Sequence, residues 1–560
     1  MKIDKLFALT LLSSALAMAT ADAAPNIRSG IGDAGSNMRT IREQVGDKLR
    51  QQRIQEIQKD READKKSRQG IDPRVEQTEK KQVHINKVIF TDSKVLNQQQ
   101  LEGYQAQVVG KIMTIAEIKQ WLAGINQYYT DHGYSVSQAI AAVDGETLKV
   151  QLLEPTVDKV TVTGNNTTKE HVIKDKVGIK EGDLVNLDEF RKNLQWFNVA
   201  HDVNVRVNFE PGTRYATTHV EEVVSEPNQF SASFWVDNYG QDNTGETRAG
   251  AVGVARSVFG YRDNVTLGTV HSEGTKAYFM TYELPVPGTQ YLRMGIGGDY
   301  SETEIKNGSL SSLDLDGLFH DVYAYVKSPI YVSDNLISNA TFQVAKKRSN
   351  SYISGWKMSQ SDTSTASLTG DLLWLFDGGY LYNQIGLTKG LTAMGGDNSF
   401  TYFSYDGELN NTWSNGLFDR IKVSAGFSNQ DSDIPSYEGF QIGGVNSVRG
   451  YDSSFLSGAK GFSVQIEGGY DISHWLNIPY TKSSRLFAFF DYGKVKDDSA
   501  IDKGNVEEAI YSTGIGLRVI GSRYWSADLT FAHRLADHPY EDDQLGKGKN
   551  EFMFMVKGGF

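Results

Sequence analysis

The segment that decides the fold is residues 525–531, Trp-Ser-Ala-Asp-Leu-Thr-Phe, in which apolar and polar side chains alternate. The same alternation recurs in residues 462–467, Phe-Ser-Val-Gln-Ile-Glu, and in residues 511–519. A period of two puts the apolar side chains on one face of a β-strand and the polar ones on the other. In a soluble sheet the apolar face would need a second sheet over it. In a membrane β-barrel that face meets lipid and the polar face lines a wet lumen.

Runs of this kind fill the chain from residue 228 to residue 560, separated by polar loops rich in Gly and Asn. Sixteen of them begin near residues 228, 245, 262, 275, 289, 317, 333, 363, 378, 399, 417, 461, 484, 509, 524 and 551. An even number suits a closed barrel with both ends on one side, and closure removes strand edges that lipid cannot hydrogen-bond. The predicted fold is therefore membrane β, a 16-stranded antiparallel transmembrane β-barrel over residues 228–560, with a long loop at about 431–460.

Composition excludes several classes of protein. The 560 residues contain no Cys, which excludes a disulfide scaffold, thiolate metal sites and a Cys nucleophile. A net charge of -12 argues against a nucleic-acid binder. After the N-terminus there is no apolar run long enough for a transmembrane helix. We find no phosphate-binding G-x-x-x-x-G-K-[ST], no G-x-S-x-G and no H-E-x-x-H, so we expect no catalytic residues, no cofactor and no metal.

The N-terminal region contains a secretory signal peptide, residues 1–23, with an apolar core from Leu6 to Met18 and an A-x-A cleavage site. Residues 24–68 contain a polar helix-forming segment, and residues 69–82 have the composition of a linker. A helix this polar is either solvated or enclosed in a polar cavity. Its narrow apolar stripe consists of Met38, Ile41, Val45 and Leu49.

An internal repeat lies between this helix and the barrel. Residues 113–122 match residues 185–194 at an offset of 72, and both begin a helix after an N-cap, Thr114 or Asn186. A strand is expected before each helical pair, at residues 83–90 and 157–162, and a β-hairpin after it, which gives two β-α-α-β-β units at 83–155 and 156–227. The hairpins turn at Asp144-Gly145 and near Pro211-Gly212.

Three local motifs accompany this organisation. The tetrad Val448, Arg449, Gly450 and Tyr451 lies in the long loop, and the barrel strand at residues 484–493 carries Phe489, Asp491 and Gly493. Asp491 falls on the polar, lumen-facing side of that strand. At the C-terminus, Phe552, Phe554, Val556 and Phe560 alternate to one face.

Together these features resemble the TpsB transporters of two-partner secretion, in the BamA-like outer-membrane superfamily. The resemblance implies that the two repeat units are POTRA domains in the periplasm, that residues 24–68 form a plug helix in the barrel, and that the long loop is the sixth extracellular loop. It also implies that Arg449 pairs with Asp491 inside the lumen, with Gly450 allowing a tight turn and Tyr451 packing on the inner wall. The terminal aromatic pattern would be the signal for barrel assembly.

The expected function follows from the same resemblance. The protein would recognise an unfolded TpsA-type exoprotein, large and β-helical, through its POTRA domains and secrete it without nucleotide hydrolysis. Expected partners also include outer-membrane lipid, the barrel-assembly machinery and periplasmic chaperones, but no nucleic acid. We expect a monomer in the outer membrane of a Gram-negative bacterium.

Three other classes of protein share some of these features. An outer-membrane protein assembly factor would share the loop and strand motifs, but that branch usually has more POTRA domains and no plug helix. A passive porin would leave the residues ahead of the barrel without a role. An outer-membrane enzyme has no catalytic motif to support it. The identity of the exported client is open, as is the POTRA edge that binds it; the strand around Val203 to Val207 is one candidate edge.

Overall fold

The computed structural model describes residues 33–67, 82–308, 311–396, 399–429, 434–476, 479–497, 506–521, 525–536 and 548–560. The expected signal peptide, and the linker apart from Gln82, lie outside these ranges. Within them, no helix is both long enough and apolar enough to cross a membrane.

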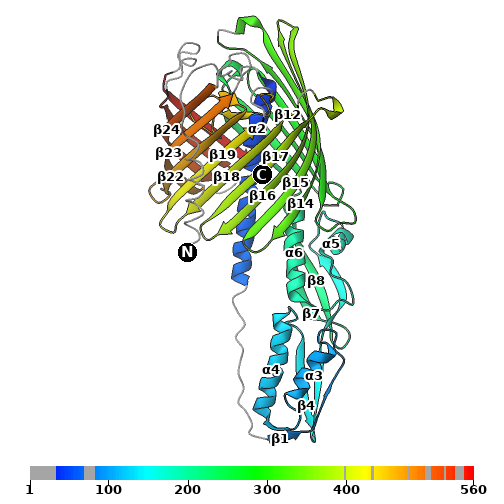
Figure 1. The fold of residues 1–560 in the computed structure, drawn as a ribbon. Coiled ribbons are helices and arrows are strands. Elements are labelled where there is room, and N and C mark those ends of the chain that lie inside the picture. Colours follow the sequence, from blue (N-terminus) through cyan, green and yellow to red (C-terminus); the bar gives the residue numbers. More distant parts are fainter. Residues whose placement is uncertain are drawn as a thin grey trace.

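Sixteen antiparallel strands close into a barrel, which confirms the predicted architecture (Figure 1). Each expected run corresponds to one strand, although β16 begins at Trp356 rather than near residue 363. The strands are β9 (Phe230–Asp237), β10 (Arg248–Arg256), β11 (Asn264–His271), β12 (Thr275–Pro285), β13 (Arg293–Glu304), β14 (Leu315–Val332), β15 (Leu336–Ile353), β16 (Trp356–Phe376), β17 (Gly379–Leu391), β18 (Thr401–Thr412), β19 (Leu417–Ser428), β22 (Lys460–Asp471), β23 (Thr481–Asp497), β24 (Val506–Gly521), β25 (Trp525–Arg534) and β26 (Asn550–Gly559).

The outer surface of the barrel is apolar. Side chains such as Ile296, Val322 and Leu368 are more than half exposed, whereas the lumen-facing residues between them include buried polar and charged groups. This is the arrangement expected when lipid surrounds the strands and water fills the bore. The first and last strands, β9 and β26, complete the ring through only five residue pairs, from Met555↔Asp237 to Gly559↔Ser233.

The first repeat unit packs a short and a long helix on a three-stranded sheet. Its elements are β1 (Gln82–Ile85), β2 (Lys87–Phe90), α3 (Gln98–Ala106), β3 (Lys111–Thr114), α4 (Ile115–Asp131), β4 (Gln138–Asp144) and β5 (Thr147–Leu153), and the sheet order is β2-β5-β4. The N-cap at Thr114 is confirmed and forms a capping box, in which Glu117 donates its N–H to Thr114 Oγ1 and the Glu117 carboxylate accepts from the Thr114 N–H.

One expectation for this unit was wrong: residues 83–90 do not form a single strand. Ile85 and Val88 are both buried, and a continuous strand cannot point residues three apart to the same face. The chain therefore breaks at Asn86. β1 pairs with β3, a strand that the sequence analysis missed, while β2 joins the main sheet alongside β5.

The second unit has the expected β-α-α-β-β order. It consists of β6 (Thr156–Thr163), α5 (Glu170–Val177), α6 (Leu187–His201), β7 (Asn204–Pro211) and β8 (Thr217–Ser225), with the sheet order β6-β8-β7. Asn186 caps α6 by accepting the Glu189 N–H. Glu222 is fully buried in this sheet and neither of its carboxylate oxygens has a hydrogen-bond partner, and this burial raises its pKa to about 7.

Helix α2 (Ala34–Ser67) runs through the barrel and emerges on the side where the two units lie (Figure 1). Its 34 residues span about 51 Å at 1.5 Å per residue. That exceeds the roughly 25 Å apolar band of a barrel. The helix ends at Ser67.

Candidate functional site: the plug helix and the loop inside the barrel

The apolar stripe of α2 faces the inner wall of the barrel. Met38, Ile41 and Val45 are almost fully buried and Leu49 is half-buried. They pack on lumen-facing side chains of the first strands, which include Trp235, Val252, Val270, Ala277, Phe279 and Phe319. The polar faces of the helix meet the polar wall, so a helix too polar to build a core finds partners in the lumen.

The long loop between β19 and β22 folds back into the barrel. It contains a short hairpin, β20 (Phe440–Ile442) with β21 (Leu456–Gly458). Val448 and Tyr451 are buried in an apolar cluster with Val495 and Ile510 on the inner wall, and the Tyr451 hydroxyl donates to the Tyr511 carbonyl at 3.3 Å. Gly450 adopts φ +91°, a conformation that L side chains rarely take.

Arg449 and Asp491 meet in a buried bidentate pair. Arg449 Nε donates to Asp491 Oδ2 and Nη2 donates to Oδ1, both at 2.7 Å, and the Arg449 backbone N–H adds a third bond at 3.0 Å. The guanidinium also lies 3.8 Å from the centre of the Phe489 ring. Gly493 leaves room for the loop, because a Cβ there would come within 2.9 Å of Val448.

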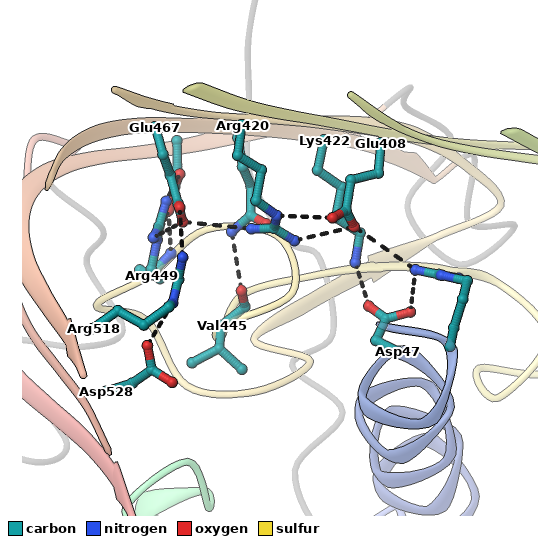
Figure 2. Close-up of polar contacts among 12 residues, drawn as sticks. Asp47, Glu408, Arg420, Lys422, Val445, Arg449, Glu467, Arg518 and Asp528 are labelled. Carbon is teal, nitrogen blue, oxygen red and sulfur yellow. Dashed lines mark hydrogen bonds and ion pairs between the residues drawn. The ribbon is translucent and has the colours of Figure 1, made fainter. Parts of the chain in front are cut away.

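Glu467 on β22 lies at the centre of a wider charge network (Figure 2). It accepts from Arg449 at 2.6 Å, and from Arg420 and Arg518 at 3.4 Å each. Arg518 continues to Asp528 at 2.7 Å. The sequence analysis did not single out Glu467; its place on the polar face of an alternating strand was the only available signal.

A second branch of the network reaches the plug helix (Figure 2). Arg420 donates to Glu408 at 3.2 Å, and Glu408 lies 3.9 Å from Arg50 of α2. On the same helix, Asp47 accepts from Arg50 and from Lys422 of β19, both at 2.7 Å. A chain of alternating charges along the inner face of the barrel thus connects Arg449 of the loop to the plug helix.

The loop and the plug also touch directly. Arg39 donates to the backbone carbonyls of Tyr437 and Gly439, and the hydroxyls of Thr40 and Ser454 lie 2.5 Å apart. These contacts bind the first turns of α2 to the inner side of the loop. Neither element can leave the lumen without breaking contacts made by the other.

A third set of contacts joins the second periplasmic unit to the barrel and to the plug. Asp202, which ends α6, pairs with Arg256 of β10 at 3.0 Å and with Arg53 of α2. Arg262 donates to the carbonyls of His201 and Asp202 at the negative end of α6. His201 is buried there, and burial together with the nearby Arg293 cation lowers its pKa to about 3, so the ring is neutral at physiological pH.

The plug does not fill the barrel completely. A cavity of about 1770 Å³ remains beside it, lined by α2, by the loop and by the inner wall. At the C-terminus, Phe552, Val556 and Phe560 are exposed and Phe554 is half-buried. Phe560 exchanges two backbone hydrogen bonds with Ala232 at the junction between β26 and β9.

A sixteen-stranded barrel with an internal helix, an inserted loop and two β-α-α-β-β units has the architecture of an outer-membrane transporter. The chain belongs to the family described as haemolysin secretion/activation protein ShlB/FhaC/HecB, whose model matches residues 217–519. A ShlB-type POTRA domain matches residues 83–154, and a POTRA domain described as a surface antigen variable number repeat matches residues 155–223. The protein is thus a two-partner secretion transporter of the outer membrane.

The relatives include a transporter and an outer-membrane assembly factor. The chain is 21% identical to outer membrane transporter CdiB of Dickeya dadantii over 477 residues, which cover 80% of this chain and 82% of the relative. It is 22% identical over 463 residues to outer membrane protein assembly factor BamA of Nitratidesulfovibrio vulgaris, covering 76% of this chain and 56% of BamA. The structure of CdiB from Escherichia coli matches the fold with a TM-score of 0.70 at 17% identity, covering 96% of this chain and all of that one.

Proposed function

We propose that this protein recognises one unfolded exoprotein in the periplasm through its POTRA units and passes it through the barrel to the cell surface without nucleotide hydrolysis. The observation that carries the proposal is that one helix inside the lumen contacts the loop, the barrel wall and the second POTRA unit. The plug helix contacts the loop through Arg39, the barrel wall through Asp47, and the second POTRA unit through Arg53.

The client is proposed to bind by strand addition at a POTRA sheet edge. β7, which contains most of the candidate segment around Val203 to Val207, is an edge strand of its sheet, and β4 is an edge of the first sheet. Exposed apolar side chains accompany both edges: Ile140 and Val143 on β4, and Phe209 on β7. An extended client could therefore gain main-chain hydrogen bonds and side-chain contacts together.

The opening step is proposed to begin at the second POTRA unit. A client that shifts α6 would loosen the contact of Asp202 with Arg53 and so weaken the hold on the plug. The helix would then leave towards the periplasm, and the loop carrying Arg449 would shift within the lumen. Folding of the client outside the cell would make its passage directional.

The pair of Arg449 with Asp491 is proposed to hold the loop in one position rather than to contribute most of the barrel's stability. A buried bidentate pair fixes geometry as well as charge. Phe489, Gly493 and the rest of the loop tetrad support that position. The terminal residues Phe552, Phe554, Val556 and Phe560 are proposed to be read by the barrel-assembly machinery after delivery by periplasmic chaperones.

Secretion of the exoprotein by cells carrying defined variants tests the proposal. Deleting residues 34–67 removes the plug, and Arg449→Ala releases the loop. Arg348→Ala provides a control, because Arg348 pairs with Asp362 of the neighbouring barrel strand rather than with Asp491. We expect the Arg449 variant to lose most secretion while Arg348→Ala keeps it. Full secretion by Arg449→Ala, at equal barrel levels, would remove Arg449 from the mechanism.

Assembly of outer-membrane proteins is the alternative function suggested by the likeness to BamA. In cells that depend on this protein, that function predicts a general loss of outer-membrane barrels on its depletion. The proposed function predicts loss of a single exported protein. Quantitative proteomics of outer membranes, together with the exoprotein in the medium, separates the two outcomes.

A further inference from the structure

Arg42, on the plug helix, lies in a cluster of groups that suit a guanidinium ion. Its Nε lies 3.5 Å from Asp299 Oδ2, and its Nη2 donates to the Tyr323 hydroxyl at 2.7 Å. The guanidinium carbon lies 4.9 Å from the centre of the Phe279 ring and 5.8 Å from that of Tyr323. Carboxylates and aromatic faces are the two kinds of surface that guanidinium ions prefer.

A second carboxylate in this cluster, that of Asp321, forms no ion pair with Arg42. Asp321 on β14 is the direct cross-strand partner of Asp299 on β13. Both side chains are buried, with 8% and 9% exposure, and one oxygen of each has no hydrogen-bond partner. Like charges opposite each other across a sheet are unfavourable unless a cation lies between them. We name the set Phe279, Asp299, Asp321 and Tyr323 the arginine cage.

The nearest cation on the barrel wall, Lys347, is paired with a third carboxylate rather than with the aspartates of the arginine cage. Lys347 on β15 is the cross-strand neighbour of Asp321, but its ammonium pairs with Glu438 of the long loop at 2.6 Å. The local set holds three carboxylates, those of Asp299, Asp321 and Glu438, and three cations. Lys347 comes from the barrel wall, whereas Arg42 and Arg39, the latter within electrostatic reach of Glu438, both come from the plug helix. Departure of the plug takes Arg42 away and leaves the two aspartates facing each other.

We propose that the arginine cage is a binding site for guanidinium side chains of the exported polypeptide. Arg42 occupies it in the closed state, and an arginine of the client takes its place when the plug leaves. Because Arg42 makes a single 3.5 Å contact with one of the two carboxylates, an arginine free of the helix could pair with both. The incoming chain would then compete with the plug for the same site. The inference rests on the proposed function, since the client brings these side chains into the lumen.

The test uses the full-length protein in planar lipid bilayers, with the fraction of time in the open state as the measure of plug release. The probe is arginine methyl ester at millimolar concentration. Citrulline methyl ester is its matched control, because it keeps the α-ammonium group and lacks the guanidinium charge. We expect the arginine ester to raise the open fraction severalfold and the citrulline ester to leave it unchanged.

Two variants assign the effect to the cage. Asp299→Asn with Asp321→Asn should raise the basal open fraction about tenfold, as loss of a charge-assisted contact implies, and should remove the response to the ester. The matched control is Asp371→Asn with Asp406→Asn, which changes two other aspartates that line the lumen cavity and should keep the response. Arg42→Gln leaves the cage intact, so it should open more often and respond to less ester.

The arginine cage is refuted if the wild-type protein responds equally to both esters or to neither, or if the two double variants behave alike. If Asp299→Asn with Asp321→Asn does not yield a folded barrel, Arg42→Gln decides alone: an unchanged open fraction and ester response overturns the proposal. No client is present in these recordings. An ester response without secretion in cells would therefore contradict the transport mechanism and not the cage, and the reverse result would contradict the cage alone.

Discussion

Replacing Arg449 by Ala should destabilise the barrel by about 3 kcal/mol. The substitution removes three charged hydrogen bonds, two to Asp491 and one to Glu467, and the stacking on Phe489. Breaking a buried ion pair costs about 3–5 kcal/mol because one charge stays buried without its partner. The lower end of this range of free-energy costs applies to Arg449→Ala. Glu467 keeps Arg420 and Arg518 at 3.4 Å, and the backbone N–H of residue 449 can still reach Asp491.

The assay is equilibrium unfolding in urea, followed by tryptophan fluorescence of the protein in detergent micelles. A double-mutant cycle with Asp491→Asn isolates the pair. Because the double variant removes the uncompensated charge, its cost should fall short of the sum of the single costs by about 2 kcal/mol. Arg348→Ala is the matched control, and its partly exposed pair with Asp362 should cost less than about 1 kcal/mol.

Two results would refute this reasoning. A cost below about 0.5 kcal/mol for Arg449→Ala would mean that the pair is replaced by water at no loss. Strictly additive costs for Arg449→Ala and Asp491→Asn would mean that the two side chains do not depend on each other. Either result would also remove the physical basis for a loop held in one position.

Four further outcomes are expected. Burial raises the pKa of Glu222 from its usual 4.5 to about 7, so the protonated carboxyl favours the folded state. The free energy of unfolding of the second POTRA unit should therefore fall by about 3 kcal/mol between pH 4.5 and 7.5. Hydrogen exchange of the backbone amides of that unit measures this pH dependence, which Glu222→Gln should abolish. Arg53→Ala, which breaks the contact with Asp202, should increase channel openings in planar bilayers, whereas Arg61→Ala should change them less. Thr114→Ala should cost the first POTRA unit about 1 kcal/mol through loss of its capping box, measured by the same exchange experiment. Deleting Phe560 should reduce the heat-modifiable barrel fraction in cells; an unchanged fraction would exclude it as an assembly signal.

The alternating sequence was sufficient to predict the barrel. A side chain on a barrel strand faces either lipid or lumen, so the period of two is visible wherever a strand crosses the membrane. The sixteen expected runs correspond to sixteen strands. The strands close into a ring because lipid cannot hydrogen-bond an unpaired strand edge. Local chemistry was equally readable at Thr114 and Asn186, where a cap depends on residues only three apart.

Less local features escaped the sequence analysis. The break at Asn86 depends on Ile85 and Val88 facing one core, and the pairing of β1 with β3 compensates for it. The motif tetrad suggested Arg449 and Asp491, but nothing in the order of residues distinguished Glu467 from other acidic residues on polar strand faces. It became a partner of three arginines because β19, β22, β24 and the long loop converge on it.

The sequence by itself determined the two repeat units, the number of strands and which side chains face the lumen. These properties depend on periodicities and spacings within tens of residues. Apart from Arg449 and Asp491, which the motifs suggested, only the tertiary structure decided which lumenal charges meet. Asp299 and Asp321 become opposite neighbours through strand register, and Arg42 reaches them from a helix more than 250 positions earlier in the chain. Charge pairing across a closed barrel is set by the geometry of closure, and no spacing along the chain encodes it.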